Sequence, residues 1–165
     1  MTSTTKGTAK VTLPEDNQIL VTREFNAPKA LVWRAYNTPD LVKRWWAGDR
    51  GEVVSAEIDL RVGGGWRYVM IGAGGSEVAF RGEYREIAAP DRLVNTEIFE
   101  GLPDPDDHPS LITVTLNEQD GRTHFRMLCE YGNQADRDAV MESGMENGMQ
   151  ESFDHLEEVA CKLDM

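Results

Sequence analysis

The sequence predicts one α+β domain in which an antiparallel sheet covers a long amphipathic helix. Three observations lead to this prediction. The chain has 165 residues, of which 40% are hydrophobic, and this is enough for one globular core without disulfides or metals. Seven segments have the alternation or the β-branched and aromatic content of strands, and residues 134–163 carry a helical repeat.

The helical repeat is the longest in the chain, and it has a clear start, with Asn133 as N-cap and Asp136 in the first turn. Burying its apolar side could contribute about 10 kcal/mol, at roughly 25 cal/mol per Å². A helix of roughly 40 Å is longer than a hairpin is wide, so we expect a curved sheet with this helix across its concave face. The apolar side of the predicted helix consists of Met141, Met145, Met149, Phe153, Leu156, Ala160 and Leu163.

Two glycines interrupt this helix, Gly144 and Gly148. Each costs about 1 kcal/mol relative to alanine inside a helix, so another factor must favour them. They could leave room for a ligand beside the flexible methionines, or they could belong to an ordinary core. Both interpretations stay open at this point.

The N-terminal part begins with residues 1–16, which have few apolar anchors and are predicted to be a disordered tail. Residues 17–165 are predicted to form the single domain. Its first strand covers 18–26, and Pro28 then opens a short helix.

A second short helix follows the first, because Thr38-Pro39-Asp40 supplies a cap, a first-turn proline and an acidic residue. Trp45 and Trp46 lie at its end and point about 100° apart. We expect them to anchor the helix pair on the sheet rather than to stack on a ligand.

Six further strands complete the predicted sheet, and the Asp-Gly turn at 120–121 marks the clearest hairpin. The acidic, proline-rich loop at 101–110 is a candidate lid. The six strands cover residues 53–60, 66–71, 78–87, 92–100, 111–118 and 123–131.

Bulky apolar side chains on the strands and on the first half of the long helix are expected to line a cavity between them. The glycine pair is the basis of this expectation, because it removes volume where the methionines face the sheet. The predicted ligand-binding residues are Trp66, Tyr68, Met70, Phe80, Phe99, Met127, Met145, Met149 and Phe153.

Composition excludes several classes of partner. A net charge of −12 disfavours nucleic acid and anionic membrane surfaces, and no apolar run is long enough to span a bilayer. Cys129 and Cys161 have no metal-binding or disulfide spacing, which fits a reducing cytoplasm. We expect no cofactor and no metal. Whether the chain is a monomer or a homodimer stays open.

Motifs for covalent catalysis are missing, since the sequence has neither GxSxG nor HExxH, and His108, His124 and His155 stand alone. An enzyme is therefore the less favoured reading. A cyclase-like reaction could still use Glu97, His124 or Tyr68 as acid or base.

Four segments resemble successive blocks of one known family: APKALVWRAYNTPDLVKRWWAG, RVGGGWRY, FRGEYREIAAPDRLVNTE and SGMENGMQESFDHLEEVACKL. The chain resembles the START/Bet v-like (SRPBCC) superfamily, and within it the homologues of the activator of heat-shock-protein ATPase. This resemblance covers roughly residues 18–163. It implies a helix-grip fold, a curved seven-stranded sheet around the C-terminal helix, with a cavity that holds a small apolar molecule in many relatives.

Three functions are compatible with this resemblance. The first is a carrier or sensor of a small apolar molecule, which we expect. The alternatives are a cyclase- or lyase-type enzyme and a protein that activates a chaperone ATPase. The last is the weakest, because the eukaryotic activators rely on an additional N-terminal domain that residues 1–16 are too short to supply.

Overall fold

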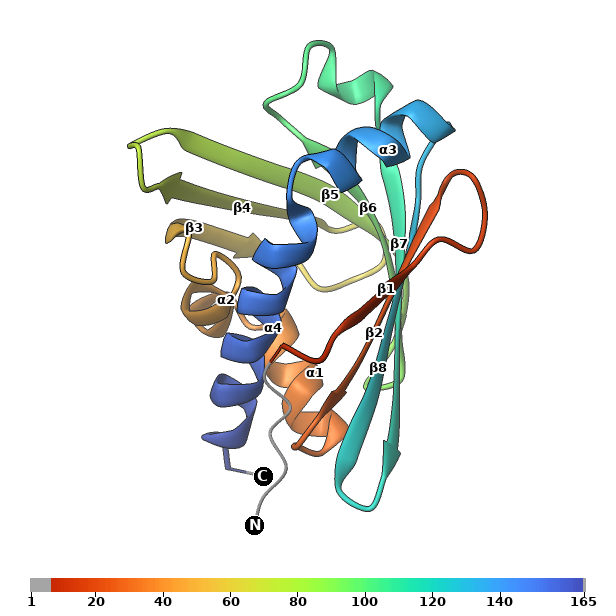
Figure 1. The fold of residues 1–165 in the computed structure, drawn as a ribbon. Helices are drawn as coiled ribbons and strands as arrows, with labels where there is room; N and C mark the ends of the chain where they lie inside the picture. The colour runs from red at the N-terminus through yellow and green to blue at the C-terminus, as the bar shows by residue number, and fades with distance from the viewer. Residues whose placement is uncertain (1–6, 165) are drawn as a thin grey trace.

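The computed structural model describes residues 7–164, and its frame is one eight-stranded antiparallel sheet (Figure 1). The strand order is β1-β2-β8-β7-β6-β5-β4-β3. The strands are β1 Lys10–Thr12, β2 Gln18–Phe25, β3 Gly51–Ile58, β4 Gly65–Gly72, β5 Glu77–Ala88, β6 Arg92–Phe99, β7 Ser110–Gln119 and β8 Arg122–Glu130.

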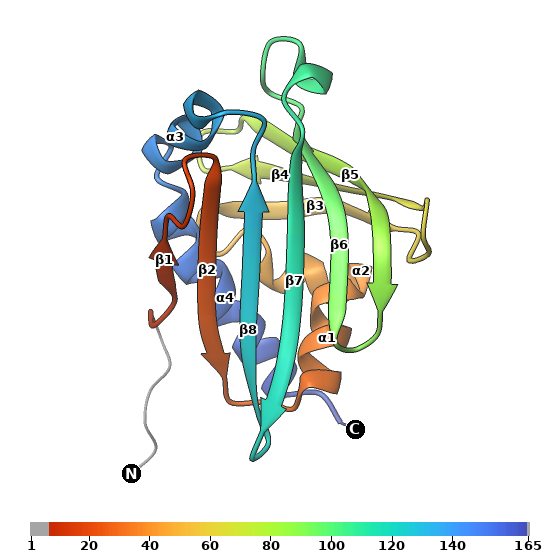
Figure 2. The same cartoon turned by 90° about the vertical axis from the view of Figure 1, so that its right-hand side faces the viewer.

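Helices occupy the concave side of this sheet. Figures 1 and 2 show that the sheet bends, so that β3, β4 and β5 cross near one end of the upright strands β2, β8, β7 and β6. The helices are α1 Lys29–Asn37, α2 Pro39–Trp45, α3 Gln134–Glu142 and α4 Met145–Cys161, with a 3-10 turn η1 at Pro105–Asp107. The α+β class and the antiparallel sheet are therefore confirmed.

The bend has a local cause in the strand pairing. The register shifts between Val53 and Ser55 where β3 pairs with β4, and between Tyr84 and Glu86 where β5 pairs with β6. Such bulges bend a strand and increase its twist, which allows the sheet to wrap around the helices.

The predicted count of seven strands is wrong, because the sheet has eight. The additional strand, β1, lies inside the segment 1–16 that was predicted to be a disordered tail, and residues 1–6 of that segment lie outside the described residues. Val11 pairs with Val21 of β2, and Ala9 is buried. Ala9 also exchanges two hydrogen bonds with the Gln150 side chain, at 3.1 and 2.7 Å. Long-range contacts therefore hold this strand.

The single helix predicted for 134–163 is also wrong, since α3 and α4 are separate helices. Gly144 adopts φ +82°, the left-handed region that glycine enters without steric cost. The start of α3 is as predicted, because Asn133 accepts a hydrogen bond from the Asp136 amide at 2.8 Å. Gly144 thus ends the first helix, and α4 takes a new direction.

The Asp-Gly turn and the start of α2 at Pro39 are confirmed, but the Thr38 side-chain cap is not. Thr38 precedes Pro39 at the start of α2, although its hydroxyl donates to Arg34 O at 2.6 Å and does not cap the helix. Asp120 and Gly121 both have positive φ, as a two-residue hairpin turn requires.

The closed part of the core lies between α1, α4 and the strands β2 and β8. Phe25, Phe125 and Phe153 meet edge to face there, with ring centroids 5.1–6.0 Å apart. Leu156 of α4 is fully buried beside them. No helix in the described part of the chain is both long enough and apolar enough to cross a membrane.

Candidate functional site

On β6 the inward-facing side chains become more exposed toward one end of the strand. On β6, Leu93 and Asn95 are 1% and 7% exposed, whereas Glu97 and Phe99 farther along the strand are only half-buried. On β7 and β8 the inward-facing residues near the same end stay buried, since Ser110 and Cys129 are 7% and 3% exposed, and only Tyr131 just beyond β8 is half-buried. The change on β6 runs toward the end that carries α3 and η1, which we call the open end.

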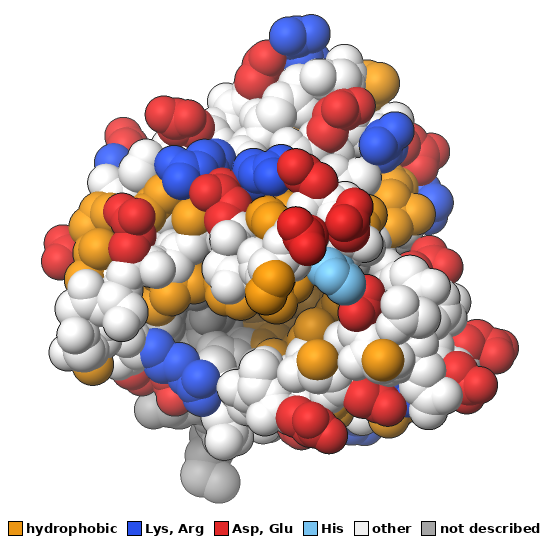
Figure 3. Space-filling view, turned by 90° about the horizontal axis from the view of Figure 1, so that it is seen from above, with side chains coloured by type: hydrophobic (Ala, Val, Ile, Leu, Met, Phe, Trp, Pro, Cys, Tyr) orange, Lys and Arg blue, Asp and Glu red, His pale blue; other side chains and the backbone are white. Residues whose placement is uncertain are grey.

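Figure 3 views the molecule from above and shows a hollow bordered by hydrophobic side chains, with acidic and basic groups on the surrounding rim. Two polar contacts tie the η1 loop to its surroundings. His108 Nδ1 lies 3.1 Å from Asp136 Oδ2 of α3, and Arg81 Nη2 donates to Asp106 Oδ1 at 2.6 Å. The loop is thus attached to both α3 and β5, and its role as a lid stays a prediction.

Seven of the nine predicted ligand-binding residues belong to the hydrophobic core of the domain, and one of them, Phe153, packs in its closed part. Four are buried and three are half-buried against them: Trp66, Tyr68, Met149 and Phe153, with Phe80, Met127 and Met145. Phe99 lies beside this cluster, with its ring stacked on Phe80 at 5.0 Å. Met70 lies at the β3 edge, where its methyl group approaches Gly51. Their role in binding stays a prediction.

Trp46 was assigned a purely structural role, yet it contributes to the same cluster. Its ring meets Tyr68 at 5.4 Å and Phe80 at 5.3 Å, both edge to face, and its side chain is half-buried. Trp45 instead stacks on Tyr36 at 5.4 Å and donates from Nε1 to Ala35 O at 2.9 Å. Adjacent helix positions diverge by about 100°, which separates the two rings. Both tryptophans anchor α2 as expected, Trp45 against α1 and Trp46 against β4 and β5, and Trp46 is in addition part of the candidate site.

Glu97 is the acidic group of the concave face. It lies on β6 opposite Ser110 of β7, whose hydroxyl donates to the Glu97 backbone oxygen at 3.3 Å. Within residues 7–164, no hydrogen bond or ion pair reaches the Glu97 carboxyl group. Burial raises its pKa from 4.5 to about 7, because the interior solvates the charged form poorly. Its carboxyl group therefore titrates near neutral pH.

Four other ionisable groups of the interior are close enough to Glu97 to be affected by its charge. Burial is the main reason that the pKa values of Tyr36, Tyr68, Cys129 and Tyr131 are raised, and the Glu97 charge raises them further. The Cys129 thiol and the Tyr131 hydroxyl are also hydrogen-bonded to each other. These groups stay protonated at neutral pH.

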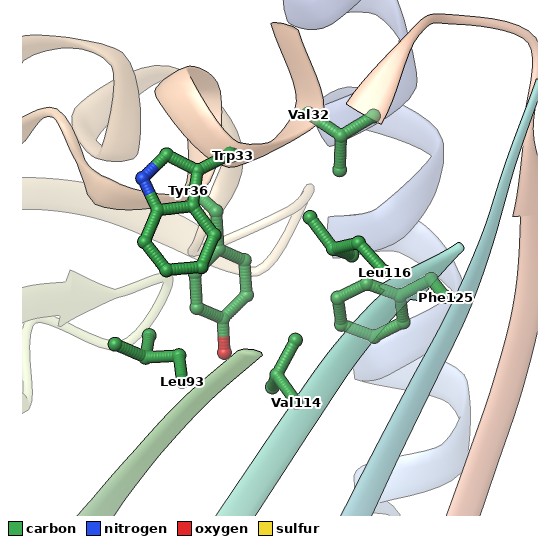
Figure 4. Close-up of a pocket in the computed structure, with 7 residues that line it drawn as sticks. All are labelled: Val32, Trp33, Tyr36, Leu93, Val114, Leu116 and Phe125. Atoms are coloured by element: carbon green, nitrogen blue, oxygen red, sulfur yellow. The ribbon is translucent and has the colours of Figure 1, made fainter. Parts of the chain in front are cut away.

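A narrow crevice lies under α1, at the closed end of the interior (Figure 4). It has no room for a water-sized sphere, so it is packed core rather than a binding site. Its walls come from α1, β6, β7 and β8, through Val32, Trp33, Tyr36, Leu93, Val114, Leu116 and Phe125.

A wide groove of about 740 Å³ crosses strands β3 to β6 and includes Arg67, Arg81 and Arg85. These arginines pair with acidic neighbours, as in the contact between Arg67 Nε and Glu100 Oε2 at 2.8 Å. Because these charges are already matched, the groove offers no strong attraction for an ionic ligand.

The glycine pair does not open the interior, and this basis of the predicted cavity is wrong. Nothing lies within 4 Å of a Cβ placed on Gly144, whose role is the helix break. A Cβ on Gly148 would instead meet the Arg50 side chain, with Nε at 3.2 Å. Gly148 therefore faces Arg50 and not a ligand.

Of the three residues considered for acid–base chemistry, Glu97 and Tyr68 face the interior, whereas His124 is exposed on β8. In the described part of the chain, no group of three or more His, Cys, Asp or Glu side chains is placed to hold a metal ion.

Solved structures from several bacteria share this fold. A Rhodobacter sphaeroides protein has a TM-score of 0.85 and 24% identity, with 94% of this chain and 99% of that one covered. An Arthrobacter aurescens protein has a TM-score of 0.82 and 25% identity, and the match covers 93% of this chain and 92% of that one. Protein Ms6760 from Mycobacterium smegmatis has a TM-score of 0.80 and 23% identity, and the match covers 92% of this chain and 96% of that one.

Sequence comparison identifies the family. No curated protein sequence matches this chain. The model of the family described as "Activator of Hsp90 ATPase homolog 1-like protein" matches residues 26–160, which span α1 to α4 and six of the eight strands, β3 to β8. The chain therefore belongs to the Activator of Hsp90 ATPase homolog 1-like family.

Proposed function

We propose that the protein binds a small, largely apolar molecule in the interior between its C-terminal helices and the sheet, and that the molecule enters at the open end. The rise in exposure along β6, from Leu93 at 1% to the half-buried Glu97 and Phe99, is the observation that carries this proposal. This gradient supports an interior that solvent reaches at the open end and that is closed around Leu93.

The chemistry of the walls also supports an apolar ligand. Trp46, Tyr68 and Phe80 present large aromatic surfaces, and Met127 and Met145 are flexible side chains that adapt to different shapes. Binding sites of this kind are mostly apolar with a few polar groups that orient the ligand. Membership of the family, for which the resemblance implies such a cavity, agrees with this proposal.

Displacement and binding of a neutral fluorescent dye, Nile red, test the proposal directly. Wild-type protein should bind the dye with saturation at a single site. Met145→Gln, which keeps the length of the side chain and makes it polar, should weaken binding severalfold because Met145 lies at the open end of the cluster. Leu13→Gln is the matched control, since Leu13 is 48% exposed outside the cluster. Equal effects of the two variants, or no saturable binding, would contradict the proposal.

Native mass spectrometry of protein purified from its own host provides the complementary test. A mass increment that survives gentle desolvation and disappears on denaturation would identify the bound molecule. If this added mass is missing from the Met145→Gln variant and present in the Leu13→Gln variant, the molecule binds at the open end.

A cyclase- or lyase-type reaction is the second candidate, and Glu97 is the observation that favours it. A general acid or base works best with a pKa near the working pH, and burial brings the pKa of Glu97 to about 7. Incubating the co-purified molecule with fresh protein separates the two functions. Chemical conversion that Glu97→Gln abolishes would indicate an enzyme, and an unchanged molecule would indicate a carrier or sensor.

A further inference from the structure

Glu97 occupies a defined place in the interior. Tyr84 of β5 pairs with Asn95, and Phe80 of β5 pairs with Phe99, so the Glu97 side chain projects between these two rows on the concave face. It lies beside Ser110, which is 7% exposed, and in electrostatic range of groups on α1, β4 and the end of β8. The carboxyl group is thus deep in the fold and is still reached by solvent from the open end.

Among the described residues 7–164, no cation forms an ion pair with Glu97. The inward-facing arginine of the sheet is Arg23, on β2, and its guanidinium already lies 3.3 Å from Asp154 and 3.5 Å from Glu157. Burial is the cause of the raised pKa of Glu97, and no neighbouring positive charge opposes that rise. A carboxyl group that lies in a poorly solvated interior without a charged partner is costly to ionise.

The remaining ionisable groups around Glu97 do not supply a counter-charge either. They are Tyr36 on α1, Tyr68 on β4, Cys129 on β8 and Tyr131 just after it. All four are neutral at physiological pH, because burial raises their pKa values. Glu97 is therefore the negatively charged group at one end of an interior whose other neighbouring groups are neutral.

We propose that Glu97 is the anchor for a basic group, and that the ligand is an amphipathic amine with one protonated nitrogen on an apolar body. This inference rests on the function proposed above and names its ligand class. A protonated amine would compensate the buried carboxylate, and its apolar body would lie along the Trp46, Tyr68 and Phe80 cluster. The net charge of −12 also attracts cations to the protein.

Three probes with the same chain length test this inference: dodecylamine, dodecanol and dodecanoate, each below its micelle concentration and in competition with Nile red. At about pH 8 and physiological salt, dodecylamine should bind at least about tenfold more tightly than dodecanol, which is the typical gain from a charge-assisted hydrogen bond. Dodecanoate should bind most weakly. The preference for the amine should decrease as the pH is lowered to about 6, because Glu97 becomes protonated there.

Glu97→Gln should reduce the preference for dodecylamine to within about threefold of dodecanol. Asp120→Asn is the control for charge alone. It removes one negative charge at the exposed tip of the β7–β8 hairpin, where φ is +55° and asparagine is well tolerated. This variant should keep the full preference.

Two results would overturn the inference: equal binding of amine and alcohol by wild type, or an amine preference that persists in Glu97→Gln. If dodecanol and Nile red bind while the amine preference is missing, the binding function stands and the ligand class is wrong. If none of the three probes displaces Nile red, both proposals fail. Thermal unfolding of each variant establishes that the protein compared is folded.

Discussion

Gly148 of α4 lies against the guanidinium group of Arg50. A Cβ placed on Gly148 would come within 3.2 Å of Arg50 Nε, and Arg50 Nη2 donates to Gly144 O at 3.4 Å. The arginine side chain is 46% exposed, so it can move by a few tenths of an ångström. The glycine is therefore not required by the backbone of its helix, and the contact above it is adaptable.

Gly148→Ala should consequently stabilise the protein by up to about 1 kcal/mol, which is the gain in helix propensity. Gly144→Ala should destabilise it by about 1 kcal/mol, because Gly144 has φ +82° and alanine is strained there. Urea unfolding of the two variants measures both changes. A loss of stability in Gly148→Ala comparable with that in Gly144→Ala would show that the Arg50 side chain cannot move away from the added methyl group.

The elements that sequence reasoning predicted well are those with local causes. Alternation located the seven longer strands, and the Asp-Gly turn and the Asn133 cap depend only on neighbouring residues. β1 escaped prediction because it has three residues and depends on distant partners, above all the contact of Ala9 with Gln150. The break at Gly144 was missed because the apolar repeat continues through it.

The candidate site was predicted in part for a similar reason. Alternation placed Glu97 and Phe99 on one face of their strand, but apolar residues occur on both faces of that strand. Which face is concave depends on bulges and on helix packing, and neither leaves a signal in the local pattern. Trp46 was missed because its contact with Tyr68 exists only after α2 docks on the sheet.

The closed and open parts of the core should respond differently to truncation. Leu156→Ala should cost about 2 to 5 kcal/mol, because Leu156 is fully buried and its removal leaves a cavity. Met145→Ala should cost less, since Met145 is half-buried at the open end. Chemical denaturation gives both values. Equal losses would mean that the first turn of α4 belongs to a sealed core.

Met149 lies between these two extremes on α4, and it is 8% exposed. Met149→Ala should cost less than Leu156→Ala and should weaken Nile red binding, because its side chain contributes to the apolar wall. Unfolding and dye titration of the same sample measure both effects. A variant as destabilised as Leu156→Ala with unaltered dye affinity would remove Met149 from the candidate site.

The two cysteines should differ sharply in reactivity. Cys129 is 3% exposed and burial raises the pKa of its thiol, whereas Cys161, whose thiol pKa is also raised by partial burial and by the Glu157 charge, is exposed near the end of α4. Because the thiolate is the reactive form, a thiol reagent should modify one cysteine quickly and the other only after unfolding. Cys161→Ser should abolish the fast reaction. If the reagent modified two thiol groups quickly in the folded wild-type protein, Cys129 would have to lie at the surface.

Glu97 should make the stability of the folded protein depend on pH. Its pKa is about 7 in the folded protein and 4.5 when unperturbed, so the folded state holds the proton more tightly than the unfolded state. The free energy of unfolding contributed by this group therefore decreases as the pH rises from about 4.5 to 7, and the full penalty applies above that range. At about 1.4 kcal/mol per pH unit, the penalty is at most on the order of 3 kcal/mol.

Glu97→Gln removes this penalty, because its amide stays neutral at every pH in the range. The variant should gain stability relative to wild type as the pH is raised from 4.5 to about 8, and the gain should level off above pH 7. Comparison with wild type at each pH cancels the contribution of the other acidic residues, and Asp120→Asn should show no such gain because Asp120 is exposed. A difference between Glu97→Gln and wild type that stays constant with pH would mean that the carboxyl group is hydrated as well in the folded protein as in the unfolded chain, and Glu97 would then have no reason to prefer a cationic ligand.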